Sequence, residues 1–308
     1  MSMMRIAVAG SGGLARLIAY YIDQETSHYV VLLSRTEQPS LAAKGFQVAV
    51  VDYEDEEDLA FALNGIDTVI STVTGANQVA LLKAALRKRC RRFAPAEFEG
   101  LPSLRPDGSP LDRHRNNIQK ILVKLDGRIE WTNFVCGVFY ERFQPGGLKQ
   151  ALVGETSGFA EEGDYIMNVR NMTAQIPAVD GQGQANVAIC MTSLQDVARF
   201  VTKAVDMPRW PRELCMSGER VPVLALVAVV ERLKGESFQR ELHSPATLRS
   251  AIQLAVVQND RSRAVVLHTL LATSEGRYAY ATSNMNTLFP GVQPVRFSEW
   301  FKRKWNLE

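Results

Sequence analysis

The sequence predicts an α/β fold, in which a doubly wound sheet of parallel strands is followed by a smaller C-terminal segment of mixed α+β structure. In the first third of the 308 residues, short apolar runs alternate with segments of helical periodicity, which is the pattern of parallel strands joined by crossover helices. After about Gly137 this rhythm is lost, and Pro145-Gly146-Gly147 interrupts the chain. The first half is therefore expected to build the sheet.

The elements can be assigned in order from these patterns. The early apolar runs carry few polar residues, as is typical of strands buried on both faces. We expect strands at 5–9, 29–33, 46–51, 68–72, 92–95 and 129–135, and helices between them at 14–21, 56–63, 78–88 and 111–125. In the second half we expect helices at 194–205, 223–233, 245–256 and 298–305, and a loop tip at 180–183.

Composition excludes several classes of protein. The formal net charge is +2, from 35 basic and 33 acidic residues, which is too balanced for a general nucleic-acid or membrane binder. The basic run at 86–92 has no interleaved aromatic residues and is expected to be the solvated end of a helix. No apolar run has the length of a membrane span, and no signal peptide is visible, so a cytoplasmic protein is expected. The four cysteines and four histidines lack metal-ligand spacing, so no metal is expected.

The strongest motif lies between the first strand and the first helix. Gly10-Ser11-Gly12-Gly13-Leu14 places glycines where the chain must bend and where backbone N–H groups must approach a phosphate without a side chain in the way. In the GxGxxG register, Ala15 occupies the position of close packing between helix and strand. The motif predicts a Rossmann-type dinucleotide site, with residues 1–150 as the nucleotide-binding domain and residues 151–308 as the substrate-binding segment.

The end of the second strand indicates which dinucleotide binds. An acid at this position would bind the ribose hydroxyls of NAD, whereas the sequence has Ser34-Arg35. A guanidinium suits the additional 2′-phosphate of NADP through charge-assisted hydrogen bonds. We therefore expect NADP(H) as the cofactor, with Ser34 and Arg35 in its site.

Two further segments follow strands at the edge where ligands of such sheets bind. Thr72, Val73 and Thr74 come after the fourth strand, and their small side chains let the backbone pass close to the cofactor. The segment 52–55 after the third strand has two interpretations, a cap for the next helix or a contact with adenine.

Together these residues resemble the NmrA-like and isoflavone-reductase-like proteins, an atypical branch of the short-chain dehydrogenases and reductases. The resemblance also rests on three segments, RRFAPAEFEG at 91–100, IEWTNFVCGVFYERFQPGGL at 129–148 and TSLQDVARFVTKAV at 192–205. The amino-acid sequence between residues 91 and 148 is most similar to that of fungal members. It implies an NADPH-binding domain, with Ala96 and Glu97 at the cofactor, and a cleft for a small aromatic or polyketide-like secondary metabolite.

The catalytic residues of these relatives are missing. No tyrosine has a lysine four residues later, so the usual Tyr-x-x-x-Lys proton donor is absent. The plant members of the resembling branch place a lysine on the helix before the sixth strand, and that position falls here at Arg115 or Asn116. Arginine stays protonated and can hold a negative oxygen, but it cannot act as a proton donor.

Three residues are candidates for the missing chemistry. Arg115 would hold the substrate oxygen, and the neighbouring His114 could titrate near neutral pH as a general acid, or be an exposed residue at the start of a helix. Tyr140 lies where the resemblance places substrate contacts, although packing explains a tyrosine there equally well. Lys120, one helical turn beyond Asn116, is expected to be solvated.

Three functions agree with this pattern. The first is an NADPH-dependent reductase of a small aromatic or polyketide-like secondary metabolite. The second is a non-redox enzyme on the same fold, such as a cyclase, isomerase or dehydratase. The third is an NADP(H)-sensing regulatory protein without turnover, as the NmrA-like resemblance allows. The sequence leaves the substrate, the proton donor and the oligomeric state open.

Overall fold

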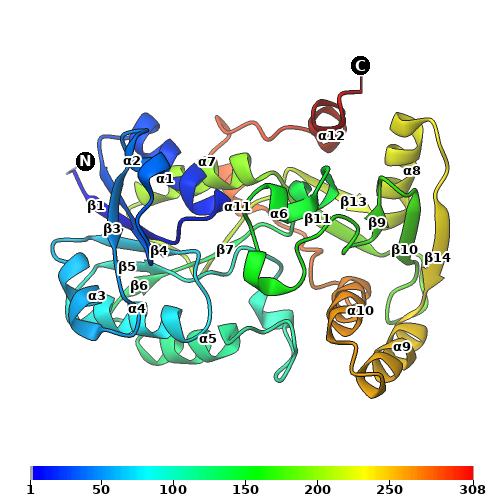
Figure 1. Cartoon of the computed structure of the whole chain (residues 1–308), viewed down its shortest axis with the longest axis horizontal. Coiled ribbons are helices and arrows are strands. Elements are labelled where there is room, and N and C mark those ends of the chain that lie inside the picture. The colour runs from blue at the N-terminus through cyan, green and yellow to red at the C-terminus, as the bar shows by residue number, and fades with distance from the viewer. Residues whose placement is uncertain (1–2, 308) are drawn as a thin grey trace.

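A six-stranded parallel sheet forms one end of the molecule in the computed structural model, which describes residues 3–307 (Figure 1). The strand order is β3-β2-β1-β4-β5-β6, so the chain winds outward in both directions from the pair β1 and β4. The strands are β1 Arg5–Ala9, β2 Tyr29–Ser34, β3 Gln47–Val50, β4 Thr68–Ser71, β5 Arg92–Ala94 and β6 Glu130–Trp131.

Helices cover both faces of this sheet. Along β1, Ile6 and Val8 pack into the core under α1 and α7, whereas Ala7 and Ala9 pack into the core with α3, α4 and α5. Figure 1 shows these two helical layers above and below the strands. The helices are α1 Gly13–Glu25, α2 Pro39–Ala42, α3 Glu56–Ala62, α4 Ala76–Arg87, α5 Arg115–Lys124 and α7 Leu194–Val205.

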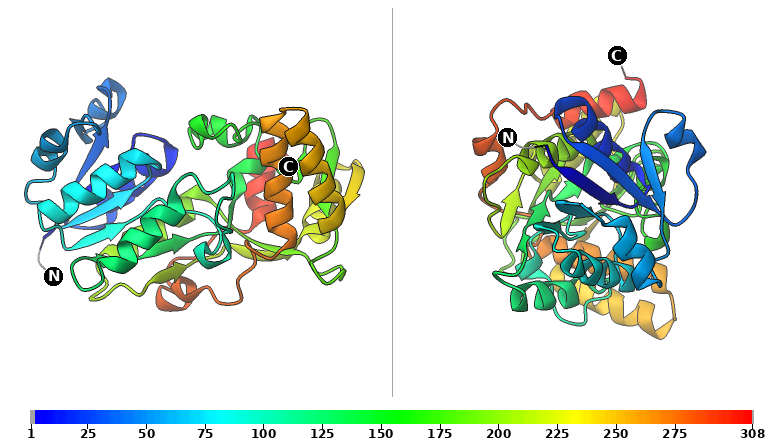
Figure 2. Two further views of the ribbon diagram at one scale, coloured as in Figure 1. Left: turned by 90° about the horizontal axis from the view of Figure 1, so that it is seen from below. Right: turned by 90° about the vertical axis from the view of Figure 1, so that its left-hand side faces the viewer.

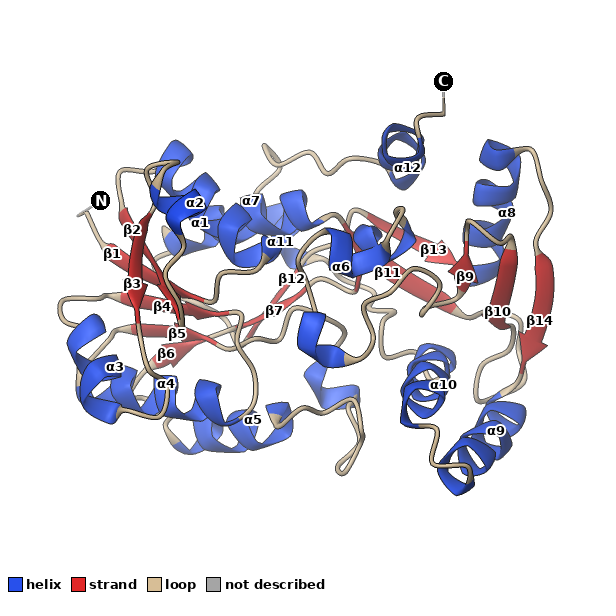
Figure 3. Cartoon of the chain, viewed as in Figure 1, coloured by secondary structure: helices blue, strands red, loops and turns tan. Residues whose placement is uncertain are grey.

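The second half of the chain builds the other end of the molecule, around its own apolar core (Figures 2 and 3). Three small sheets have the strand orders β14-β10-β9, β13-β11-β8 and β12-β7. Their strands are β7 Asn133–Val135, β8 Val138–Phe139, β9 Met167–Asn168, β10 Thr173–Pro177, β11 Ala188–Thr192, β12 Glu213–Cys215, β13 Glu219–Pro222 and β14 Gln239–His243. The remaining helices are α6 Gly147–Gln150, α8 Val223–Lys234, α9 Pro245–Val257, α10 Arg261–Ser274, α11 Asn284–Leu288 and α12 Phe297–Trp305, with 3₁₀ turns η1 Pro102–Leu104, η2 Tyr140–Phe143 and η3 Glu155–Ser157.

The two halves are interleaved, because α7 covers the first sheet and β12 pairs with β7. The Rossmann-type fold class is confirmed, while the boundary between residues 150 and 151 stays a prediction. Within residues 3–307, no helix is long and apolar enough to cross a membrane.

Most of the expected elements are present, and three of the differences bear on the core or the site. The expected sixth strand is divided: β6 pairs with β5, but β7 pairs with β12 from the second half. The helix expected at 111–125 begins only at Arg115, because Arg113 and His114 have left-handed backbone conformations. Helix α10 was not expected, and its buried face carries the hydroxyls of Thr269 and Thr273, which bond to carbonyls one turn earlier in the helix.

Two of the helices that cover the sheet have N–H groups of their first turn capped by the side chain that precedes the helix. The Asp55 carboxylate accepts hydrogen bonds from the N–H groups of Glu57 and Asp58 at 2.8 and 3.2 Å and so caps α3. The capping interpretation of segment 52–55 is confirmed. Ser193 caps α7 in the same way, through the N–H group of Asp196.

One residue of the basic run contradicts the expectation of a solvated helix end. Arg92 lies in β5 with its side chain fully buried, where it forms an ion pair with Glu130 and donates hydrogen bonds to the carbonyls of Val205 and Met207. Its guanidinium also lies 4.9 Å from the ring centre of Trp210. Arg92 therefore attaches the sheet to the chain that follows α7, a role that a charge count along the sequence does not show.

This arrangement predicts that Arg92→Ala lowers the free energy of unfolding by about 3–5 kcal/mol, because Glu130 and two carbonyls lose their partner. The neighbouring Arg91 offers a matched control, since its ion pair with Asp67 is half-exposed and its removal should cost less than about 1 kcal/mol. Urea unfolding followed by circular dichroism measures both. Equal midpoints for the two variants would contradict the structural role of Arg92.

Candidate functional site

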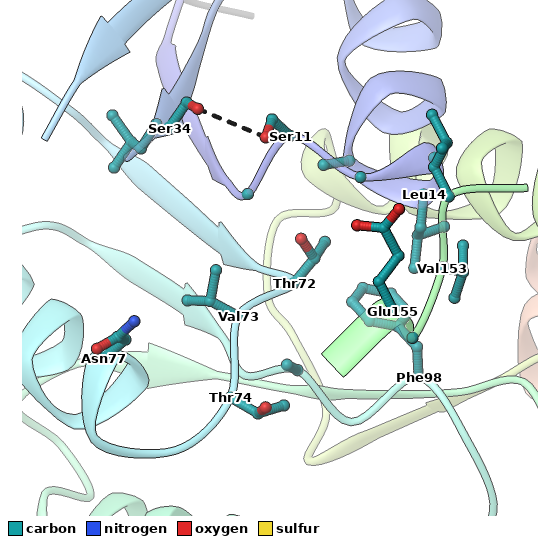
Figure 4. A pocket seen from close by; sticks show the side chains of 18 of the residues that line it. Ser11, Leu14, Ser34, Thr72, Val73, Thr74, Asn77, Phe98, Val153 and Glu155 are labelled. Carbon is teal, nitrogen blue, oxygen red and sulfur yellow. Dashed lines mark hydrogen bonds between the residues drawn. The ribbon is translucent and has the colours of Figure 1, made fainter. Parts of the chain in front are cut away.

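A cavity of about 360 Å³ lies at the carboxyl ends of the central strands, where doubly wound sheets bind their ligands (Figure 4). Its walls come from the segments after β1, β2, β3, β4 and β5 and from three segments of the chain beyond residue 110. The lining residues from the central sheet are Gly10, Ser11, Gly12, Gly13, Leu14, Ala15, Leu33, Ser34, Arg35, Tyr53, Thr72, Val73, Thr74, Asn77, Ala96 and Phe98. The others are Arg113, Arg115, Phe139, Leu152, Val153, Gly154 and Glu155.

The glycine turn shapes the cavity next to β1. Gly10 has φ of +119°, and a Cβ there would overlap the Thr72 hydroxyl, which itself donates to the Ala9 carbonyl at 2.8 Å. Only glycine lets the turn pass this close to the end of β4. Helix α1 then starts at Gly13 without a side-chain cap and without an acidic residue in its first turn.

An uncapped helix start of this kind suits an anion. The N–H groups of Ser11, Gly12 and Leu14 have no acceptor among residues 3–307, and the positive end of the α1 dipole lies at the same place. A pyrophosphate would supply acceptors to these groups. The residues present therefore fit the diphosphate of a dinucleotide.

The third glycine has an additional role that the sequence does not show. The Gly13 N–H group donates to the Leu152 carbonyl at 2.9 Å, and a Cβ on Gly13 would overlap the Ala151 carbonyl oxygen. The segment 151–155 thus lies against the glycine turn. Figure 4 shows the Glu155 carboxylate directed toward Leu14 at the start of α1. Glu155 therefore contributes a carboxylate to the lining of the same cavity.

The end of β2 provides a free cation. Arg35 is exposed, lines the cavity and has no hydrogen-bond or ion-pair partner in the described part of the chain. The buried Ser34 hydroxyl lies 3.4 Å from the Ser11 hydroxyl, which joins the two turns (Figure 4). Tyr53 forms the adjacent wall, where burial raises the pKa of its hydroxyl and the charge of Arg35 partly opposes this. Such a cation beside the glycine turn fits a phosphate group on the ribose.

Of the two cofactor residues expected after β5, Ala96 and Glu97, only one lines the cavity. Ala96 lines the cavity, and its N–H group donates to the Gln78 side chain at 2.5 Å. Glu97 does not line it. Its carboxylate is buried in an ion pair with Arg105 and accepts a hydrogen bond from Gln119 at 3.1 Å. The alternation of side chains after β5 turns Ala96 and Phe98 to the cavity and Glu97 to the opposite side.

Of the three expected catalytic residues, only Arg115 lines the cavity. Its guanidinium bonds the Glu99 carboxylate at 2.6 Å, whereas the alternative position, Asn116, faces Arg105 and Asp107 on another side. His114 precedes α5 as an exposed residue and is not among the lining residues. Arg113 lines the cavity in its place, because two consecutive left-handed residues redirect the chain.

Tyr140 is enclosed in the core of the second half. Its hydroxyl donates to the Val295 carbonyl at 3.2 Å, and its ring packs against Phe297 and Trp300. Burial raises the pKa of this hydroxyl further above its ordinary value. Tyr140 is therefore a core residue, in agreement with the interpretation that it serves packing. Lys120 lies at the surface, paired with Asp107, as the expectation of a solvated side chain required.

Sequence reasoning missed Asn77, Phe98, Arg113, Phe139 and the segment 151–155. Phe98 could have been found from the alternation after β5. The segment 151–155 carries no motif, and only the tertiary structure brings it to the glycine turn.

Comparisons with known proteins agree with this site. Residues 9–123 match the family described as NAD(P)H-binding. Oxidoreductase BOA1 of Botryotinia fuckeliana is 27% identical over 249 residues, which cover 77% of this chain and 78% of that protein. Oxidoreductase swnN of Metarhizium robertsii is 22% identical over 99% of this chain and 98% of its own.

The fold has solved counterparts. Leucoanthocyanidin reductase from Vitis vinifera superposes with a TM-score of 0.73 at 20% identity, covering 97% of this chain and 98% of that one. An isoflavone reductase superposes with a TM-score of 0.71 at 16% identity, covering 98% and 99%. The chain therefore contains an NAD(P)H-binding domain and shares its overall fold with these reductases. NAD(P)H binding agrees with the expectation from the glycine turn, and both of the fungal relatives named above are oxidoreductases.

The contact between Gly13 and segment 151–155 can be tested by substitution. Gly13→Ala places a methyl group on the Ala151 carbonyl, so the segment must move away and the Gly13–Leu152 hydrogen bond must break. We expect amide exchange in residues 151–155, measured by mass spectrometry, to become at least about tenfold faster, the loss of roughly 1.4 kcal/mol of local protection. Gly181→Ala is the control, because a Cβ there meets nothing within 4 Å. Unchanged exchange in Gly13→Ala would show that the segment does not depend on this contact.

Proposed function

We propose that this oxidoreductase is an NADPH-dependent reductase of a small aromatic or polyketide-like molecule. The observation that carries the proposal is a single cavity that contains an uncapped helix start, a free Arg35 and, on its other side, the Arg115 guanidinium. Leucoanthocyanidin reductase has been solved with NADPH, and the neighbour AtPrR2 with NADP⁺ and (+)-pinoresinol, which supports this choice of cofactor and of substrate size.

In this proposal each part of the cavity has one task. The N–H groups at the start of α1 bind the diphosphate, and Arg35 binds the 2′-phosphate that distinguishes NADP from NAD. The bound cofactor supplies a hydride. The apolar side chains of Phe98 and Phe139 exclude water from part of the cavity. The segment 151–308 supplies the remaining walls and so selects the substrate.

Arg115 is the residue that would act on the substrate oxygen. Its ion pair with Glu99 at 2.6 Å fixes the guanidinium, and an arginine stays charged at every pH at which the protein is folded. A fixed positive charge stabilises the oxygen that becomes negative as hydride arrives at a carbonyl carbon. Because arginine does not release a proton, solvent water supplies the proton that completes the alcohol.

The choice of NADPH is tested with Arg35→Ala. Loss of the charged hydrogen bonds to the 2′-phosphate should weaken NADPH binding by roughly 10- to 100-fold and leave NADH binding unchanged, as measured by titration calorimetry. The control is Arg209→Ala, which removes an exposed arginine that does not line the cavity. Equal affinities of NADPH for Arg35→Ala and the unchanged protein would refute the assignment.

Reduction itself is tested with Arg115→Met and a panel of small aromatic carbonyl compounds and enones. The unchanged protein should oxidise NADPH in the presence of at least one panel member, measured at 340 nm, and Arg115→Met should lower kcat by about 10²–10³-fold with NADPH affinity retained. Turnover without NADPH oxidation would favour a cyclase, isomerase or dehydratase. Cofactor binding without any turnover would favour an NADP(H)-sensing regulatory protein.

A further inference from the structure

Beside the proposed oxyanion contact lies a group of four arginines, Arg105, Arg113, Arg115 and Arg277, which we call the arginine cluster. Of these, Arg113 and Arg115 line the cavity. Three carboxylates lie among them, those of Glu97, Glu99 and Asp112. The cluster therefore carries one more positive charge than negative charge. A surplus charge in a partly buried place lowers stability unless something else neutralises it.

The carboxylates are already engaged. Glu99 bonds Arg105 at 3.0 Å and Arg115 at 2.6 Å and also contacts Arg277, while Glu97 pairs with Arg105. Burial opposes ionisation of Glu99, but the three arginines outweigh it and lower its pKa to about 2. The Glu99 side chain is thus shared among three cations.

Arg113 is the cation left without a partner. It lines the cavity and forms no ion pair within residues 3–307, although its neighbour Arg115 lies in the same wall. Burial and the charge of Arg115 lower the pKa of its guanidinium, and the charge of Glu99 only partly opposes this. The backbone adds strain, since Arg113 has φ of +48° and His114 has φ of +65°.

Other donors in the cluster are also unused. The side chain of Arg277 is only 1% exposed, yet its Nε and one terminal nitrogen have no hydrogen-bond partner among the described residues. The Nε of Arg115 is buried without a partner as well. Buried donors in folded proteins are nearly always paired. Because Arg115 lines the cavity and Arg277 does not, the unpaired Nε of Arg115 is the group that indicates a missing acceptor at this wall.

We propose that Arg113, supported by Arg115, binds a carboxylate of the small substrate. This inference rests on the proposed function, because it assumes that one cavity holds both cofactor and substrate. Phe98 and Phe139 line the same cavity, so the ligand combines an anionic group with an apolar body. A carboxylate supplies two acceptor oxygens for planar guanidinium donors.

The cofactor also carries anionic groups. The strand order of the sheet separates the site of its 2′-phosphate from the arginine cluster. Arg35 follows β2, and the cluster surrounds Glu97 and Glu99 after β5, with β1 and β4 between these strands. Neighbouring strands lie about 4.8 Å apart, which places the ends of β2 and β5 roughly 14 Å from each other. The 2′-phosphate near Arg35 and the anion near Arg113 are therefore different groups.

The test uses protein saturated with NADP⁺ and titration calorimetry with acetate, benzoate and cinnamate, each compared with its neutral amide. At least one carboxylate should bind at least about tenfold more tightly than its amide. Arg113→Gln should remove this preference, Arg113→Lys should retain part of it, and the control Arg209→Gln should leave it intact. The thermal midpoint of Arg113→Gln should equal or exceed that of the unchanged protein, because the variant removes an unpaired charge from a strained loop.

Three results would overturn the inference. They are no binding of any of the three carboxylates, equal binding of carboxylates and amides, and a preference that survives in Arg113→Gln. A loss of NADP⁺ affinity in Arg113→Gln as large as in Arg35→Ala would assign Arg113 to the cofactor and would also overturn it. These titrations do not require turnover, so a failure of the carboxylate site and a failure of the reductase proposal are distinguishable.

Discussion

The Glu99 carboxylate is the interaction on which the rest of the site depends. It joins Arg105 from the chain after η1, Arg115 from the start of α5 and Arg277 from the chain after α10. The backbone repeats this connection, because the Glu99 carbonyl accepts from the N–H groups of Cys136 and Gly137 at 3.0 and 3.1 Å. One acidic residue thus joins the central sheet to the second half of the chain and holds Arg115 in the cavity wall.

The Glu99–Arg115 ion pair makes the site different from that of an enzyme whose proton donor is a tyrosine with a nearby lysine. A lysine or tyrosine donor needs a pKa that permits proton transfer, whereas a guanidinium held by a buried carboxylate stays charged. Because the pKa of Glu99 is held at about 2, the Glu99–Arg115 pair stays ionised at every physiological pH. Such a site favours charge stabilisation over proton donation. Arg113 lies in the same wall and forms no ion pair within residues 3–307.

The glycine turn and segment 151–155 form a second such connection, at the opposite wall. Gly10, Gly12 and Gly13 were expected to make room for a phosphate, and in the structure they also make room for the chain itself. The Leu152 carbonyl accepts from one N–H group of the turn, while the N–H groups of Ser11, Gly12 and Leu14 have no acceptor within residues 3–307. The same small residues thus serve the packing of the two halves and the approach of a ligand.

The sequence by itself determined the parallel sheet, the glycine turn at α1, the cation after β2 and the capped start of α3. These features depend on residues close together in the chain, through apolar periodicity, backbone freedom and side-chain caps. Only the tertiary structure decided that β6 and β7 have different partners, that Arg92 is buried and that Arg113 rather than His114 lines the cavity. Each of these outcomes is set by a partner far away in the sequence or by a local backbone conformation that no periodic pattern records. The fold and the NAD(P)H-binding domain could therefore be predicted from the sequence. The arginines around Glu99 come from distant parts of the chain, and only the tertiary structure brings them together.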